Sequence, residues 1–299
     1  MQNQVTGIGS NAFENTNLSG IIMPTSLSGL YNNTFKRGPT NYNNLSGVDF
    51  SLCSNFTGIG NDNFYLCGNL DEVIFPNSMT GMGSQNFELS SINTIDFSNT
   101  LLKGMVNENF KQCLDLQTFV YSPVFESMGN SNFEAAKVDD VVLPETLKTV
   151  GNLNWFNCEK VGGGVWNTQP LSIPCSIETI GDRNWEQSSA VQEVLISGCF
   201  SGQIGDLNWK DCASITKFYL DADDPLASIG SNNFENCSSL TQVYIRPNCG
   251  SGFWQGTNNF LAINNNAQFF VDNSVFSEYN NATFSGAQGL PNGVTMQSV

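Results

Sequence analysis

The chain has no histidine among its 299 residues. This absence removes the most common general base and the most common zinc or copper ligand, and it excludes Ser-His-Asp and Cys-His nucleophile arrangements. Basic residues are also few, because 11 Lys and Arg stand against 27 Asp and Glu, for a net charge of -16. Nucleic-acid binders need many cations along the phosphates, so we expect no nucleic-acid partner.

Long hydrophobic runs are missing as well. No stretch reaches the roughly 18 apolar residues that a membrane-spanning helix requires. Residues 1–10 have neither the basic start nor the apolar centre of a secretion signal. We therefore expect no membrane insertion, and no signal peptide is visible. Three alternatives stay open: a mature fragment, export by another route, and assembly into a virion.

What the sequence has in abundance is internal repetition. An aromatic residue, in most cases preceded by Asn, recurs every 22 to 30 residues from Phe13 to Phe260. A hydrophobic residue followed by Gly precedes most of these aromatics, and a Cys often comes three residues after them. A short β-branched run that ends in Pro, such as residues 71–76, follows. We predict that each repeat is a helical or 3₁₀ turn, a strand and a corner at which Gly supplies unusual backbone angles.

The aromatic and the Cys of each repeat are expected to point into a shared core, because three residues separate them on one helical turn. They are the predicted structural anchors of the repeat. These anchors are Phe64, Phe87, Phe110, Phe133, Trp155, Trp185, Trp209, Phe234, Cys67, Cys113, Cys158, Cys212 and Cys237.

One repeat, residues 229–247, reads IGSNNFENCSSLTQVYIRP. It resembles the BspA-like class of leucine-rich repeats, whose turns follow the pattern IG..aF.nC.sL..v.iP, and the resemblance covers residues 7 to 260. It implies an α/β repeat fold, a leucine-rich-repeat-like solenoid of about ten turns with short parallel strands. Residues 269–279 resemble the strand and short helix that close such arrays. We therefore predict a solenoid over residues 1–260 and a C-terminal cap over residues 261–299.

The nine cysteines cannot all pair within one chain. Most are interpreted as reduced core residues because the repeat sets their spacing. Four lie outside the repeat position, and a disulfide among them stays open. These four are Cys53, Cys175, Cys199 and Cys249.

Two repeats are long, with extra residues at 36–46 and 161–172. Each insertion carries one aromatic residue, Tyr42 or Trp166, in a polar loop with Gly and Pro. Aromatics in loops are favoured contact residues, so these two are the candidate partner contacts. The alternative is that both loops fold back over the solenoid.

Acidic and amide side chains gather at several corners, for example at Asp221, Asp223 and Asp224. Solvated turns explain them better than calcium sites, because no calcium-loop pattern is present. The pair Asp139 and Asp140 precedes a predicted strand, which gives little support to a glycosidase. The Asn before each aromatic is expected to satisfy backbone groups at the corner. We predict no catalytic, cofactor or metal site.

These observations predict a non-enzymatic surface for adhesion or for recognition of a protein or glycan. The expected location is extracellular, on a cell surface or on a virion surface or tail. The alternatives are a structural protein that stacks on or decorates a larger particle, and a glycan-active enzyme. No cap is visible before the first repeat, so we also expect that end to be covered, either by another subunit in a homo-oligomer or larger assembly or by an upstream segment missing from this sequence.

Overall fold

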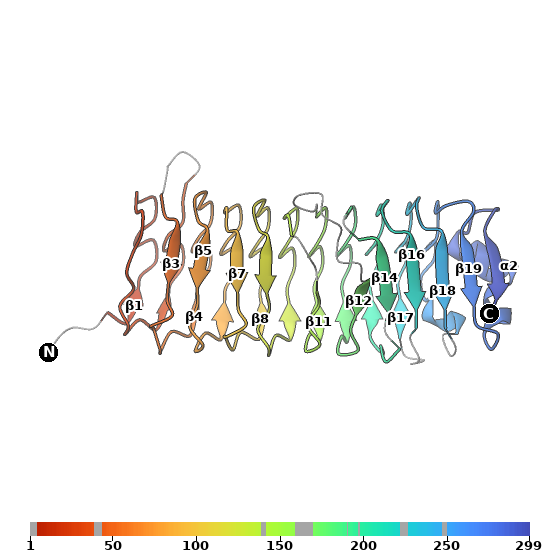
Figure 1. Cartoon of the computed structure of the whole chain (residues 1–299), viewed down its shortest axis with the longest axis horizontal. Coiled ribbons are helices and arrows are strands. Elements are labelled where there is room, and N and C mark those ends of the chain that lie inside the picture. Colours follow the sequence, from red (N-terminus) through yellow and green to blue (C-terminus); the bar gives the residue numbers. More distant parts are fainter. Residues whose placement is uncertain are drawn as a thin grey trace. The chain divides into compact units, whose positions relative to one another are not determined.

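The computed structural model describes residues 5–38, 44–138, 142–158, 170–189, 191–196, 198–221, 227–246 and 250–299. The chain divides into two compact units, Met1–Asp139 and Asp140–Val299. Within each unit, strands of one turn lie beside strands of the next (Figure 1). The fold is a parallel-strand solenoid of about 11 turns with few helices, which confirms the predicted fold class. No helix in the described part is long and apolar enough to cross a bilayer.

Each unit has parallel two-residue strands, here the short-strand sheet, and parallel longer strands, here the long-strand sheet. In unit 1 the short strands β1 (Gly7–Ile8), β2 (Gly29–Leu30), β4 (Gly58–Ile59) and β6 (Gly81–Met82) form one four-stranded sheet, and β8 (Gly104–Met105) pairs with β10 (Ser127–Met128). The longer strands are β3 (Gly47–Asp49), β5 (Glu72–Ile74), β7 (Thr94–Asp96) and β9 (Thr118–Val120).

In unit 2 the short strands are β11 (Thr149–Val150), β13 (Thr179–Ile180), β15 (Gln203–Ile204) and β17 (Ser228–Ile229). The longer strands are β12 (Leu171–Ile173), β14 (Glu193–Ile196), β16 (Lys217–Leu220), β18 (Gln242–Ile245), β19 (Gln268–Val271) and β20 (Thr295–Ser298). The helical segments in the described part of unit 2 are η1 (Ser251–Phe253), α1 (Phe276–Tyr279) and α2 (Ala282–Gln288). Both α-helices lie in the segment predicted to be the cap.

The aromatic anchors stack on one another inside each unit. From Phe13 to Phe133, successive ring centroids are 5.1–5.5 Å apart and successive planes lie within 12° of each other. From Trp155 to Phe260, the centroids are 5.1–5.8 Å apart and the planes lie within 11°. Such offset stacking adds to the apolar area that the rings bury.

The anchor thiols are hydrogen-bond donors as well as core residues. Cys113 Sγ donates to the carbonyl of Phe87 at 2.9 Å, and Cys212 Sγ donates to the carbonyl of Trp185 at 2.9 Å. Each bond therefore ties a thiol to an aromatic residue of the preceding turn. Burial raises the pKa of both thiols to about 12.

The Asn residues that precede the rings from Phe64 onward form a buried ladder. Asn208 Oδ1 accepts hydrogen bonds from the backbone N–H of Asn184 at 3.0 Å and from its side-chain Nδ2 at 3.2 Å. In unit 2 the ladder ends on α2, where Asn259 Nδ2 donates to Gln288 Oε1 at 3.0 Å. The fully buried ladder residues are Asn63, Asn86, Asn109, Asn132, Asn154, Asn184, Asn208, Asn233 and Asn259.

Of the predicted helical or 3₁₀ turn at the anchors, the described residues show only single turns of the 3₁₀ type, as where the N–H of Cys67 donates to the carbonyl of Phe64 at 3.2 Å. The N–H groups of Asp62, Phe64 and Leu66 donate instead to carbonyl groups of the next turn, at 3.0, 2.7 and 3.0 Å. Asp62 and Leu66 have left-handed φ values of 56° and 58°. The backbone therefore bonds between turns, which leaves none of these groups for an intrahelical ladder.

The glycine of the hydrophobic-Gly step also has a different role from the one predicted. Among the described glycines, only Gly289 has a positive φ. At Gly205, a Cβ would overlap Asp182 Oδ1 and would lie 2.9 Å from the carbonyl carbon of Gly181. Glycine is required there because successive turns approach closely, whereas the left-handed positions carry other residues.

A disulfide joins Cys175 and Cys199, whose Cα atoms are 5.1 Å apart. Cys53 is buried, and its thiol donates to the carbonyl of Pro24 at 3.4 Å. Cys249 lies outside the described residues. The structure therefore links two of the four cysteines for which the sequence left pairing open.

Candidate functional site

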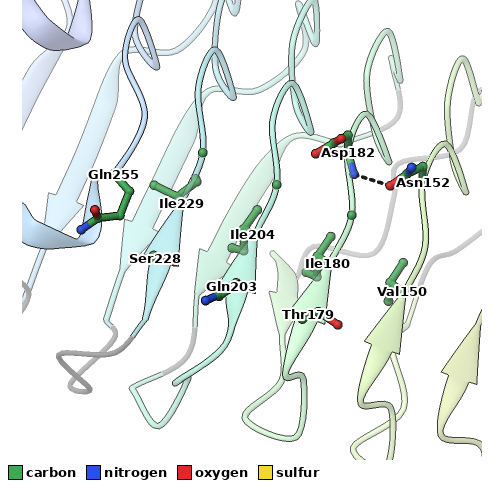
Figure 2. Close-up of a pocket in the computed structure, with 13 residues that line it drawn as sticks. Val150, Asn152, Thr179, Ile180, Asp182, Gln203, Ile204, Ser228, Ile229 and Gln255 are labelled. Atoms are coloured by element: carbon green, nitrogen blue, oxygen red, sulfur yellow. Dashed lines mark hydrogen bonds between the residues drawn. The ribbon is translucent and has the colours of Figure 1, made fainter.

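A groove of about 420 Å³ runs over the short-strand sheet of unit 2 (Figure 2). One wall carries a row of polar side chains, with one from each of three successive strands. Thr179, Gln203 and Ser228 are paired in register, so they recur once per turn. Thr179 and Gln203 are exposed and Ser228 is half-buried. Because the first residue of each short strand points outward, these side chains face solvent.

The floor of the groove is apolar and its backbone groups are already bonded. Ile180, Ile204 and Ile229 are at most 3% exposed. The N–H groups of Gly181, Gly205 and Gly230 each donate at 2.8 Å to the turn before them, to the carbonyl groups of Val150, Ile180 and Ile204. A ligand in the groove would therefore meet side chains rather than free backbone donors.

The second wall is formed by an exposed ladder of Asn and Asp side chains. Asn152 Oδ1 accepts from the N–H of Asp182 at 2.8 Å, and Asp182 Oδ1 accepts from the N–H of Asp206 at 2.8 Å. One oxygen of Asp182 is thus used structurally. In the described part, no hydrogen bond occupies its other oxygen, Oδ2.

The groove carries little charge. Among the described residues that line it, Asp182 is the one titratable residue and none is Lys or Arg. No group of three or more Cys, Asp or Glu in the described part could hold a metal ion.

A second surface lies on the long-strand sheet of unit 2. Tyr219, Tyr244 and Phe270 form an outward-facing stack, here the aromatic column, with centroids 4.9 and 4.8 Å apart. Burial and the nearby Glu193 raise the pKa of Tyr219. Because the rings cover one another's faces, the column presents mainly ring edges to solvent.

The predicted partner contacts Tyr42 and Trp166 lie outside the described residues, as do Asp139, Asp140 and Asp223. The sequence interpretation missed the groove residues Thr179 and Gln203. A signal was available, because a polar residue precedes the Ile-Gly step in unit 2 where unit 1 mostly has Gly. Asp224, which the sequence grouped with Asp221 and Asp223, also lies outside the described residues.

Comparison with known proteins identifies the repeat. A family model described as the BspA type leucine rich repeat region matches in six copies, over residues 1–41, 38–162 and 164–287. The chain belongs to the BspA-type leucine-rich-repeat family. A comparison with curated proteins finds no match.

Several solved structures are similar to this BspA-type chain. A leucine-rich repeat protein from Bacteroides ovatus is 15% identical, and the match spans 99% of this chain and 88% of that protein with a TM-score of 0.39. The pneumococcal vaccine antigen PcpA is 13% identical, with 99% and 85% coverage and a TM-score of 0.39. A leucine-rich cell surface protein from Faecalibacterium prausnitzii is 14% identical, with 99% and 89% coverage and a TM-score of 0.35.

Proposed function

We propose that the protein is a non-enzymatic binding module, used in adhesion or recognition, and that the groove of unit 2 takes its protein or glycan partner. The observation that carries the proposal is the row formed by Thr179, Gln203 and Ser228 over a floor whose backbone is fully bonded. Solenoids commonly offer such extended surfaces to ligands, since every turn adds a side chain at the same position.

The lining residues favour binding over catalysis. A glycosidase of the usual kind needs two carboxyl groups that flank the scissile bond. Among the described residues that line the groove, Asp182 has the one carboxyl group, and the chain has no histidine that could serve as a base. Family membership agrees, because leucine-rich repeats supply interaction surfaces rather than a characteristic chemistry.

An extracellular location, on a cell surface or in a virion, is part of the proposal. The disulfide between Cys175 and Cys199 supports an oxidising compartment, since cytosolic thiols are kept reduced. Cys199 is exposed, so a reducing environment would reach it. The related protein from Faecalibacterium prausnitzii carries the description of a cell surface protein.

The proposal is tested by filling the groove. The double variant Thr179→Arg and Gln203→Arg places two long side chains over the floor without touching the core. The wild-type chain and this variant are compared on arrays of glycans and on immobilised extracellular matrix proteins. We expect saturable binding that the variant loses. Binding that survives in the variant, or hydrolysis of a bound glycan, would contradict the proposal.

Self-association through the first turns of unit 1 is a second candidate function. Phe13 at the start of the ring stack is half-buried, whereas Phe35 is 2% exposed. Val5 and Tyr31 in the same region are 51% and 65% exposed. Light scattering coupled to size exclusion is expected to show a discrete oligomer that Tyr31→Glu dissociates. A monomer at high concentration would refute this role and would leave the groove proposal intact.

A further inference from the structure

We infer that the groove of unit 2 binds an uncharged polysaccharide chain that runs from turn to turn, with one sugar unit above each turn. This inference rests on the proposed binding function and specifies its ligand. It depends on the spacing of the polar row, on the bonded backbone of the floor and on the charge of the lining.

The spacing of the row fits a sugar chain better than a peptide. Neighbouring strands lie about 4.8 Å apart, so Thr179, Gln203 and Ser228 present a hydroxyl or amide at that interval. An extended peptide advances about 3.3 Å per residue, and its side chains on one face recur at about twice that distance. The side chains of a bound peptide would therefore no longer align with the polar row after one or two turns. An extended chain of pyranose rings advances by about one ring length per unit, which is close to one turn.

The floor excludes the usual mode of peptide capture. Peptides commonly gain affinity by adding a strand to a free sheet edge. In the groove, the N–H groups of Gly181, Gly205 and Gly230 are already bonded to the preceding turn. Recognition must then come from side chains. Polyhydroxylated ligands meet that condition, because each hydroxyl both donates and accepts a hydrogen bond.

The charge of the lining selects an uncharged chain. None of the described residues that line the groove is a cation, and the whole protein carries a net charge of -16. Uronate or sulfate groups would be repelled by Asp182 and by the overall field. The exposed Oδ2 of Asp182 can instead accept a hydrogen bond from a neutral sugar hydroxyl, because Oδ1 alone is held by Asp206.

The aromatic column does not compete for this ligand. Sugar rings pack through their C–H groups on the electron-rich faces of aromatic rings, whereas ring edges carry the opposite partial charge. Tyr219 and Tyr244 are stacked at 4.9 Å with planes 9° apart, so each covers a face of the other. The column is therefore better suited to side chains of a protein than to a glycan.

The length of the groove sets the length of the ligand. Its lining extends from Val150 through the turns of Ile180, Ile204 and Ile229 to Gln255, which lies at one end of the groove (Figure 2). Five successive turns therefore contribute. Affinity should rise with chain length up to about five sugar units, because each added unit meets one more turn.

The test is calorimetric titration of the full chain with uncharged oligosaccharides of two to eight units. The series uses β-linked glucose, mannose, xylose, galactose and N-acetylglucosamine backbones, with oligogalacturonate as the anionic comparison. We expect at least one neutral series to bind, with affinity that increases to about the pentasaccharide and then levels off. Oligogalacturonate is expected to bind at least tenfold more weakly than the neutral chain.

Gln203→Ala is the matched variant, and Gln268→Ala on β19 is its control. Both side chains are exposed, so neither change should alter the melting temperature. Loss of one or two ligand hydrogen bonds should weaken binding by about fivefold to a hundredfold for Gln203→Ala. Gln268→Ala should bind as the wild type does.

Three outcomes would overturn the inference: no neutral series binds, affinity does not depend on length, or Gln203→Ala binds normally. The proposed function has a separate readout. In that readout, the wild-type chain binds no oligosaccharide and yet binds a matrix protein that the groove-filling double variant does not bind. That result would support the proposed binding function and would rule out a polysaccharide as the ligand.

Discussion

The short-strand sheets of the two units have the same register but different surfaces. The first residue of each strand in unit 1 is Gly7, Gly29, Gly58, Gly81 or Gly104, with Ser127 as the exception. The equivalent residue in unit 2 is Thr149, Thr179, Gln203 or Ser228. The same strand arrangement therefore carries a bare surface in unit 1 and a surface lined with side chains in unit 2, and the two differ at the first residue of each strand.

The contrast has a steric component within unit 1. A Cβ at Gly58 would overlap the carbonyl oxygen of Gly81, whereas a Cβ at Gly81 would meet nothing within 4 Å. Some glycines of unit 1 are thus required by packing, and Gly81 is not. Unit 1 therefore serves as an internal control for the groove, because it has the fold without the polar row.

The buried Asn ladder should be equally important in both units. In Asn86→Ala, the backbone N–H and the Nδ2 of Asn63 lose their shared acceptor, and in Asn208→Ala the same two groups of Asn184 lose theirs. Two buried donors without partners cost about 1–3 kcal/mol each. We expect a loss of about 2–6 kcal/mol in the free energy of unfolding for each variant, measured by urea denaturation.

Asn61→Ala is the control for the ladder variants. Its Oδ1 accepts from the N–H of Ser84 at 2.8 Å, but the bond is exposed, so water can replace it. The expected cost is about 1 kcal/mol or less. A ladder variant that loses no more than this control would show that the buried bonds are not what holds the turns together.

Alanine at Gly58 and at Gly81 should separate the two kinds of glycine in unit 1. Gly58→Ala forces a Cβ against a backbone oxygen, and overpacking of this kind costs about 1–3 kcal/mol. Gly81→Ala has space and a compatible φ, so it should be neutral or should stabilise by up to about 1 kcal/mol. Thermal melting of the two variants checks this, and equal melting temperatures would contradict it.

Because burial raises the pKa of the anchor thiols, we expect both units to lose stability at high pH. Cys113 and Cys212 have pKa values of about 12 in the fold, against a reference of 9.0. Above pH 9 the unfolded chain releases these protons while the fold retains them. The stabilisation is therefore complete below pH 9 and is lost as the pH rises towards 12. Each thiol should contribute about 1 kcal/mol per pH unit in that window.

Urea denaturation at pH 8, 9 and 10 measures this slope. Cys113→Ala and Cys212→Ala should each flatten it by about one proton, although both variants lose stability at every pH from the change in packing. An unchanged slope would show that the thiols ionise in the folded state.

The sequence predicted what depends on periodicity. The spacing of aromatics such as Phe64 and Trp209 predicted stacked turns, because a large ring that recurs once per turn must be buried against its neighbours. It did not predict the left-handed residues Asp62 and Leu66, since their N–H groups bond to another turn and no local preference reveals that.

The groove could not be predicted from the sequence for a related reason. Thr179 and Gln203 resemble any solvent-facing strand residues, and only the register between turns places them in one row. Likewise, the role of Gly205 depends on the distance to Asp182, one turn away. Contacts between turns are decided by the stacking geometry, which a single repeat does not encode.

Substitutions in the stacks of aromatic anchors should have the smallest effect on the free energy of unfolding. Trp185 and Trp209 in unit 2 stack at 5.4 Å, as Phe13 and Phe35 do in unit 1, but their indole Nε1 atoms are buried and have no hydrogen-bond partner in the described part. Trp185→Phe removes an unsatisfied donor that costs about 1–3 kcal/mol. It also leaves a cavity with a cost of similar size.

The two terms should nearly cancel, so we expect Trp185→Phe to change the free energy of unfolding by about 1 kcal/mol or less. The reverse change, Phe64→Trp, adds volume without removing a donor and should destabilise by about 1–3 kcal/mol. Urea denaturation of both variants measures the difference. If Trp185→Phe is the more destabilising change, the stacked tryptophans of unit 2 contribute packing that the stacked phenylalanines of unit 1 lack, and the two units are not interchangeable scaffolds.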